Sequence, residues 1–257
     1  MVSALGAAAA GTVLEIGPGK GVLTAILARN AGKLIAIELD RVLAAQLRMK
    51  YAAWPNVEII EGDILKIDLS TVLGPRPGAL AGVADAPKPI AQVIGNLPYY
   101  ITSDILLRLF SYQAYFQRIV IMVQKEVADR IAAKPGGRDY GLLSATAQLY
   151  AKVEKLFTVP RGSFAPPPKV HSAALQLTVA PQWERLQVPE REFIEFLKLS
   201  FGQKRKTLVN NLKPRYAPAL LQQALKKAGV RADARSETLP LEKAAAVFRM
   251  LRGKEVS

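Results

Sequence analysis

The segment Gly95-Asn96-Leu97-Pro98-Tyr99-Tyr100 places an amide beside aromatic rings directly after an apolar run. The exocyclic amine of a nucleobase has two N–H donors, which the Asn96 side-chain carbonyl and a backbone carbonyl such as that of Leu97 can accept. Those bonds would leave the nitrogen lone pair facing an incoming methyl group, while Tyr99 offers a flat face on which a base can stack. The alternative is structural: Pro98 stiffens a turn and Tyr99 packs in the core.

A second aromatic candidate, Phe164, lies in a proline-rich loop between Val159 and Ser172. Three prolines stiffen this loop, so Phe164 can be held in the open and could clamp a flipped base together with Tyr99. Arg161 and Lys169, in the same loop, are placed to contact phosphates. The alternative is a phenylalanine buried beneath the loop.

A glycine-rich loop with the spacing E-x-G-x-G-x-G runs from Glu15 to Gly21, where a strand pattern passes into a helix pattern. Glycine lets the chain turn tightly and lets a ligand touch the backbone. Two acids end the next strands: Glu38, which can accept the hydroxyls of a ribose, and Asp63, which can hold an adenine amine. Ligands bind at the carboxyl ends of parallel strands, so these features predict one crevice. Individually, Glu38 could be a solvated acid and Asp63 a cap.

Short apolar runs alternate with helical patterns over the first 180 residues, which predicts an α/β fold with a parallel, doubly wound sheet. The expected strands are Thr12–Ile16, Leu34–Ile37, Val57–Ile60, Ile90–Ile94 and Arg118–Val123, and the expected helices are Gly19–Asn30, Arg41–Tyr51 and Ile101–Phe110. Lys152–Thr158 and Ser172–Val179 follow without a helix between them and suit an antiparallel hairpin at the sheet edge. The Pro/Gly-rich stretch Gly74 to Pro89 is expected to be a surface excursion.

From residue 181 onward only helical patterns occur, over Pro189–Leu199, Lys204–Leu212, Pro218–Ala228 and Leu241–Leu251. These 77 residues hold 16 Lys and Arg against 8 Asp and Glu, a net charge of +8. We therefore expect two domains, 1–180 and 181–257, of which the second is a small basic helical domain that faces a polyanion.

The amino-acid composition favours some function classes and excludes others. The 257 residues include 35 Lys and Arg but 21 Asp and Glu, a net charge of +14 that favours a nucleic-acid partner. Cysteine is absent and His171 is the single histidine, so thiolate and histidine-rich metal sites are excluded and no metal is expected. No apolar run is long enough to span a membrane, and the start lacks a basic signal region, so we expect a soluble cytoplasmic monomer.

Taken together, the motifs VLEIGPGKGVLT, IAIELD, EGDIL, GNLPYYITS and FAPPPKVHS resemble the ribosomal RNA adenine dimethyltransferases in order and spacing. The resemblance implies a Rossmann-like domain that uses S-adenosylmethionine. The C-terminal FGQKRKTLVNNL and RSETLPLEKAAAVFRML are similar to the housekeeping branch, which dimethylates two adjacent adenines near the 3′ end of small-subunit (16S) RNA. The small ribosomal subunit is then the expected partner.

The resemblance also implies a role for each matching residue. The cofactor pocket would be formed by Glu15, Gly17, Gly19, Glu38, Leu39, Asp63 and Ile64. Glu38 would hold the ribose, and Asp63 with Ile64 the cofactor adenine. Asn96, within Asn96-Leu97-Pro98-Tyr99, would lie between cofactor and target amine, with Tyr99 and Phe164 stacked on the target base. RNA phosphates would be contacted by Arg161, Lys169, Lys204, Arg205 and Lys206.

Two other function classes remain open at this point. The family normally begins with a segment containing an FGQxFL-like stretch that closes the cofactor pocket, whereas this sequence begins Met1-Val2-Ser3-Ala4-Leu5 and soon reaches its first strand. We expect that segment to be missing, which keeps open a non-catalytic or weakly catalytic ribosome-assembly factor. An NAD-dependent oxidoreductase is disfavoured, because the dinucleotide fingerprint would need glycine where Val22 stands.

Overall fold

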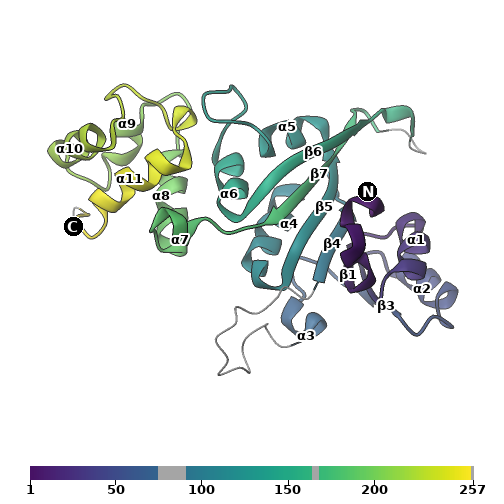
Figure 1. Cartoon of the computed structure of the whole chain (residues 1–257). Coiled ribbons are helices and arrows are strands. Elements are labelled where there is room, and N and C mark those ends of the chain that lie inside the picture. The colour runs from purple at the N-terminus through teal and green to yellow at the C-terminus, as the bar shows by residue number, and fades with distance from the viewer. Residues whose placement is uncertain (75–90, 164–167, 256–257) are drawn as a thin grey trace. The chain divides into compact units, whose positions relative to one another are not determined.

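The computed structural model of the chain describes residues 1–74, 91–163 and 168–255 (Figure 1). It divides into two compact units, the first made of residues 1–128 and 153–179 and the second of residues 129–152 and 180–257. The last segment of the second unit begins at residue 180, one residue before the expected boundary, but this unit also includes residues 129–152. Apart from Gly74, the excursion expected up to Pro89 lies outside the described residues.

The first unit is built on a seven-stranded sheet with the order β3-β2-β1-β4-β5-β7-β6 (Figure 1). The strands are β1 (Thr12–Ile16), β2 (Lys33–Glu38), β3 (Val57–Glu61), β4 (Ala91–Asn96), β5 (Phe116–Gln124), β6 (Ala151–Val159) and β7 (Ser172–Val179). Strands β1 to β5 pair in parallel, and β7 pairs antiparallel to β5. The predicted α/β class is confirmed, and the two late strands complete the sheet beyond β5.

The register of the central strands brings their carboxyl ends to one edge. Ile16, the last residue of β1, pairs with Ile37 of β2 on one side and with Gly95 of β4 on the other. Each of these strands is a nearly continuous apolar run because both faces of the sheet are covered. Polar side chains that follow the runs, such as Glu38 and Asn96, therefore meet at the same edge.

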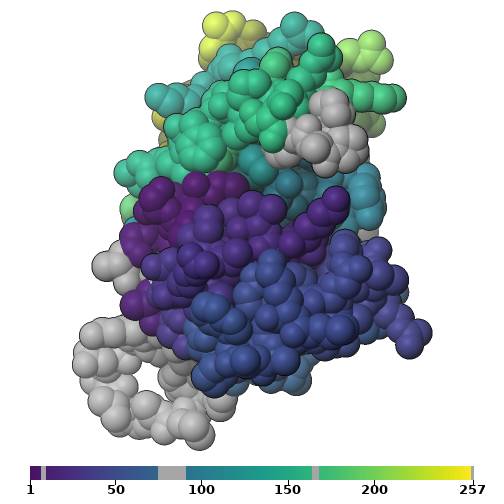
Figure 2. All heavy atoms as spheres, turned by 90° about the vertical axis from the view of Figure 1, so that its right-hand side faces the viewer, coloured from purple at the N-terminus to yellow at the C-terminus, as the bar shows by residue number. Residues whose placement is uncertain are grey.

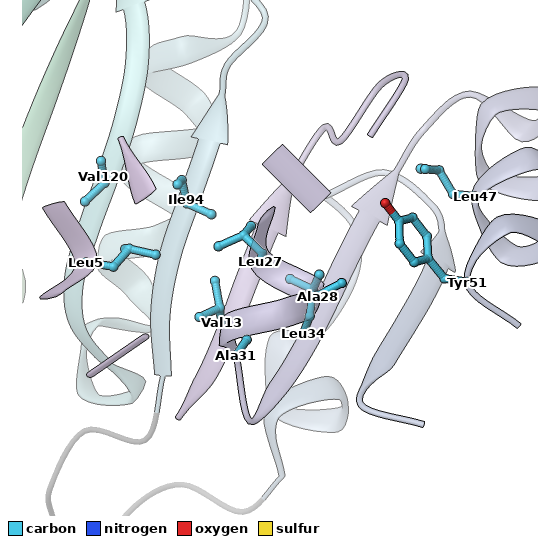
Figure 3. Close-up of a cluster of buried hydrophobic side chains, with 10 residues drawn as sticks. All are labelled: Leu5, Val13, Leu27, Ala28, Ala31, Leu34, Leu47, Tyr51, Ile94 and Val120. Carbon is cyan, nitrogen blue, oxygen red and sulfur yellow. The ribbon is translucent and has the colours of Figure 1, made fainter. Parts of the chain in front are cut away.

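One face of the sheet is covered by η1 (Val2–Ala10) and α1 (Val22–Asn30). Leu5 of η1 is fully buried and shares a hydrophobic cluster with Val13, Ile94 and Val120 (Figure 3). In Figure 2, the purple N-terminal residues and the blue residues that include α2 (Arg41–Lys50) form this side of the unit. Leu5 thus belongs to the core, and burying a leucine side chain adds about 1.5–3 kcal/mol to the free energy of unfolding.

Helix α1 begins three residues later than expected. Gly19 and Gly21 have φ angles of 58° and 79°, in the left-handed region, so the chain cannot be helical there. The predicted start at Gly19 is therefore wrong, whereas α2 lies within one residue of its predicted bounds. The remaining α-helices of this unit are α3 (Leu69–Leu73), α4 (Thr102–Ser111) and the first part of α5 (Lys125–Ile131), and the unit also has the short η2 (Gln113–Tyr115) and η3 (Arg161–Ser163).

The second unit consists of helices around an aromatic core. They are α6 (Leu142–Tyr150), α7 (Trp183–Leu186), α8 (Glu190–Ser200), α9 (Leu208–Leu212), α10 (Pro218–Ala228) and α11 (Leu241–Leu251), with the short η4 (Ser236–Thr238). The ring of Phe248 lies 5.4 Å from those of Phe193 and Phe196, centroid to centroid. No helix within the described ranges is long and apolar enough to cross a bilayer.

The basic run of this unit lies before a helix rather than inside one. Lys204, Arg205 and Lys206 are exposed in a turn, and α9 begins only at Leu208. Thr207 caps that helix, because its hydroxyl oxygen accepts a hydrogen bond from the amide of Asn210 at 3.3 Å. The helix start predicted at Lys204 is wrong, since the cap at Thr207 places the first helical residue four residues farther on, at Leu208.

Candidate active site

The loop between β1 and α1 has three glycines with positive φ, and they serve different purposes. Gly21 has a φ of 79°, which strains any residue with a Cβ, and a Cβ there would also lie 2.7 Å from a methyl carbon of Leu47. A Cβ on Gly19 would meet nothing within 4 Å, so the backbone at Gly19 borders open space. Gly17 donates its amide to the carbonyl of Ile37 at 3.0 Å, which holds the loop against β2. The loop therefore presents bare backbone to a ligand.

Glu38 ties this loop to the next one. Its Oε2 accepts a hydrogen bond from the amide of Gly19 at 2.9 Å, and its Oε1 accepts one from the amide of Asp40 at 2.9 Å. The side chain is only 7% exposed. A carboxylate can accept about four hydrogen bonds, so two of its lone pairs remain for the hydroxyls of a ligand. Glu38 is thus fixed in place while keeping acceptor capacity.

Glu15 lies at the same edge but is fully buried beneath the loop. The hydroxyl of Thr24, in the first turn of α1, donates to its Oε2 at 2.8 Å. Burial raises the pKa of Glu15 to about 7, and the nearby Glu38 carboxylate adds to the rise, while the hydrogen bonds from Thr24 oppose it. Its side chain does not line the pocket described next, so Glu15 shapes the site through Thr24 and α1.

A pocket of about 70 Å³ opens at the carboxyl ends of β1, β2 and β3. Its walls are mostly apolar, and Glu38 and Asp63 supply acidic groups. Asp63 is partly engaged, because its Oδ1 accepts the amide of Leu65 at 2.9 Å. The lining residues are Ile16, Gly17, Ile37, Glu38, Leu39, Gly62, Asp63, Ile64, Pro98, Tyr100, Ile101 and Ile105. Of the predicted cofactor residues, Gly17, Glu38, Leu39, Asp63 and Ile64 are therefore brought together in one pocket.

Tyr100 lines this pocket although it is 80% exposed, and the sequence motifs did not mark it as a site residue. They also missed Ile101 and Ile105, an i, i+4 pair at the start of α4. The spacing of that pair was a usable signal, because residues four apart share one face of a helix. For Tyr100 the signal was its place next to Tyr99.

The Asn-Leu-Pro-Tyr segment continues directly from this pocket. Asn96 ends β4 and is exposed, whereas Leu97 is buried and donates its amide to the carbonyl of Met122 at 2.9 Å. The hydroxyl of Tyr99 lies 2.9 Å from that of Ser172, the first residue of β7. Thr102 donates its hydroxyl to the Pro98 carbonyl at 3.0 Å, which fixes the turn. Asn96 thus projects from a rigid frame, beside a tyrosine held at its hydroxyl end.

The loop that precedes β7 reaches the same region through Ser172. Arg161 and Lys169 are exposed, and the Arg161 amide donates to Nδ1 of His171 at 3.3 Å. Phe164 lies outside the described residues, so its predicted stacking role stays a prediction. Ser172, which directly follows this loop, is the residue that contacts Tyr99.

Comparisons with known proteins identify the family of this chain. Residues 2–252 match the ribosomal RNA adenine dimethylase family. The chain belongs to that family. It is therefore an S-adenosylmethionine-dependent rRNA adenine dimethyltransferase, as its motifs predicted. The oxidoreductase alternative is excluded by this membership.

Individual relatives agree with the family match. Proteins named ribosomal RNA small subunit methyltransferase A from Koribacter versatilis and Geobacter sulfurreducens are 58% and 42% identical to the chain, covering 98% and 97% of it and 88% of each relative. A solved dimethyladenosine transferase from Plasmodium falciparum is 27% identical, with a TM-score of 0.73 over 96% of this chain and 92% of that one. The 23S rRNA methyltransferase ErmE is 25% identical, with a TM-score of 0.68 over 97% and 96%.

The described residues fit S-adenosylmethionine. The apolar walls contributed by Ile37, Ile64 and Ile101 suit a flat adenine, and the free lone pairs of Glu38 suit ribose hydroxyls. The open space at Gly19, which any Cβ would occupy, allows the rest of the cofactor to approach the backbone. We expect Asp63 to accept the adenine amine, as the family resemblance implies.

Replacing Glu38 with alanine should weaken S-adenosylmethionine and S-adenosylhomocysteine by similar factors, because both carry the same ribose. Losing hydrogen bonds to a charged group costs about 1.5–3 kcal/mol, which corresponds to about 10- to 150-fold in Kd. Isothermal titration calorimetry measures both affinities. Glu58→Ala is the matched control, since Glu58 is half exposed on β3 and pairs with Lys33. Unchanged affinities for Glu38→Ala would refute the assignment.

Replacing Glu15 with glutamine should flatten the pH dependence of stability. Folding raises the Glu15 pKa from 4.5 to about 7, so the folded state binds more protons between these values and stability falls as pH rises through that window. The full effect is about 3 kcal/mol. Urea denaturation at pH 5 and pH 8 should show a smaller difference for Glu15→Gln than for the wild type. An identical difference would show that Glu15 does not titrate in this window.

Proposed function

We propose that the chain transfers methyl groups from S-adenosylmethionine to N6 of two adjacent adenines near the 3′ end of small-subunit ribosomal RNA, giving N6,N6-dimethyladenosine. The observation that carries the proposal is the exposed Asn96 at the end of β4, two residues before Pro98 of the cofactor pocket. The curated relatives named above act on the small subunit according to their names, which supports this choice of substrate. Such an enzyme would meet its substrate in the cytoplasm.

In this reaction S-adenosylmethionine supplies an electrophilic methyl group. The Asn96 side-chain carbonyl and the Leu97 backbone carbonyl accept the two N6 hydrogens of the target adenine and turn its lone pair toward the methyl group. Tyr99, held at its hydroxyl by Ser172, stacks on the base. The family resemblance implies that Phe164, which lies outside the described residues, stacks on the other side of the base. No strong base is required, because the alkylated amine is acidic enough to lose its proton to water.

The lysine and arginine side chains outside the pocket bind the phosphates of the RNA backbone. Lys204, Arg205 and Lys206 are exposed together in one turn of the second unit, and Arg161 and Lys169 are exposed in the first. Exposed lysine and arginine side chains bind phosphates by releasing counterions, without reading the sequence. We infer that these residues hold the subunit RNA while Asn96 and Tyr99 act on the adenine.

Replacing Asn96 with alanine should abolish most methyl transfer and leave RNA affinity nearly unchanged, because the amide acts on the reacting amine rather than on phosphates. Losing one directed polar group in a transition state costs about 2.7–4 kcal/mol, or about 10²–10³ in rate. Mass spectrometry of RNA from unmethylated small subunits measures the modification, and a filter-binding assay measures affinity. Asn30→Ala is the control, since Asn30 is exposed at the end of α1.

The same assay separates the proposed enzyme from a factor that only binds. A wild-type chain that binds small subunits but leaves the adenines unmodified would support the assembly-factor alternative. An Asn96→Ala variant that keeps more than about a tenth of the wild-type rate would contradict the role of Asn96.

Replacing Lys204, Arg205 and Lys206 with alanine should weaken subunit binding and flatten its salt dependence. Each phosphate contact contributes about 0.7–0.9 to the slope of log affinity against log salt, so the slope should fall by about two to three. Binding at four salt concentrations gives the slope, and S-adenosylmethionine affinity should not change. Lys226→Ala with Lys227→Ala, both exposed at the end of α10, is the control. An unchanged slope in the triple variant would indicate a merely solvated turn.

A further inference from the structure

A second pocket, of about 320 Å³, lies entirely among residues of the second unit. It is bordered by the start of α6, the residues that precede α6, the turn after α8 and η4. Two hydrogen bonds tie these segments together: the Gly136 amide donates to the Glu237 carbonyl at 2.8 Å, and Lys204 Nζ donates to the Arg138 carbonyl at 3.1 Å. Its volume is within the range of about 300–1,000 Å³ that small-ligand pockets occupy.

Groups that attract an anion line part of this pocket. Lys204 and Arg130 contribute cationic side chains, and the Lys204 ammonium has donors beyond the one used by Arg138. The first residues of α6, Leu142 to Ser144, also line the pocket. The first amides of a helix have no acceptor within the helix, so they add partial positive charge on this side.

Groups that accept hydrogen bonds line the same pocket. Asp139 is exposed at its rim, and Glu237 contributes a second carboxylate, 3.8 Å from Arg235. Phe201 adds a half-buried aromatic ring that lies 6.0 Å from the ring of Tyr140, centroid to centroid. Two carboxylates repel a simple anion such as phosphate. They suit a ligand that combines an anionic group with hydrogen-bond donors and a flat apolar face.

We propose that this pocket binds one unstacked nucleotide of the RNA substrate. Its phosphate lies against Lys204, Arg130 and the start of α6, its hydroxyl or amine donors face Asp139 and Glu237, and its base contacts Phe201. Proteins read RNA chiefly through unpaired nucleotides that are splayed out in this way. The proposal rests on the proposed function, which makes RNA the partner. It assigns to the second unit a recognition site in addition to its surface charge.

The first test uses mononucleotides as probes. Backbone amide chemical shifts of Gly141 and Ser144 are followed by NMR while 5′-AMP, 5′-GMP, 5′-CMP or 5′-UMP is added. Saturable shifts are expected with at least one of them, and weaker ones with adenosine or inorganic phosphate alone. Equal shifts with phosphate alone would reduce the pocket to an anion site and overturn the proposal, as would the absence of shifts with every nucleotide.

The second test blocks the pocket without changing its charge. Gly141 lines the pocket, its φ of −164° suits any residue, and a Cβ there would meet nothing within 4 Å. Gly141→Phe should weaken small-subunit binding about tenfold, a loss of about 1.4 kcal/mol, lower the salt slope by about one because a phosphate contact in the pocket is lost, and leave S-adenosylmethionine affinity unchanged. Gly141→Ala, which adds one methyl group, is the matched control and should bind like the wild type.

A third variant keeps the proposal testable if Gly141→Phe melts at a lower temperature than the wild type. Asp139→Asn changes one exposed side chain and should weaken mononucleotide binding several-fold without weakening phosphate binding. Wild-type subunit binding by Gly141→Phe, or wild-type mononucleotide binding by Asp139→Asn, would overturn the nucleotide assignment and leave the methyltransferase proposal standing. Failure of the unaltered chain to modify small-subunit RNA would instead overturn the proposed function.

Discussion

The edge of the sheet at which the pocket opens depends on one carboxylate, which accepts hydrogen bonds from two loops. Glu38 accepts the amide of Gly19 from the β1–α1 loop and the amide of Asp40 from its own β2–α2 turn, so two loops at the carboxyl ends of adjacent strands are held together. Because these bonds use opposite oxygens, the side chain cannot rotate without losing one of them. The lone pairs left over are then held in a fixed direction, which would preorganise the carboxylate for the ribose that we expect it to bind.

Glu15 and Glu38 are both buried near this edge, but different groups surround their carboxylates. Glu15 is fully buried and bonded to Thr24, and its pKa is raised to about 7, so its charge is suppressed below neutral pH. Such a group supports α1 at low electrostatic cost, and its predicted part in the cofactor site stays a prediction. Glu38 is nearly as buried, yet it borders the pocket and receives two backbone amides. The difference between a supporting acid and a binding acid therefore arises from what surrounds each side chain.

The second unit shows that a basic surface and a recognition pocket can share a residue. Lys204 belongs to an exposed cationic turn and also lines a pocket that contains Asp139 and Glu237. Surface cations provide long-range attraction, which salt screens, whereas a pocket with both signs of charge distinguishes one ligand from another at contact. A polyanion held by the first kind of interaction can then be positioned by the second.

The sequence by itself determined the α/β class, the strand order along the chain and five of the residues that line the pocket at the strand ends, because continuous apolar runs, glycine spacing and strand-end acids are local signals that the sheet topology aligns. It also gave α10 and α11 their bounds, since Pro218 and Gly229 mark one helix and apolar spacing marks both. Only the tertiary structure decided that Tyr100, Ile101 and Ile105 line the pocket, that Glu15 lies beneath it, and that residues 129–152 join the C-terminal helices. The spacing of Ile101 and Ile105 marks one face of α4, but only the sheet topology brings that face to the pocket. The places of Glu15 and of residues 129–152 depend on contacts between residues far apart in the chain.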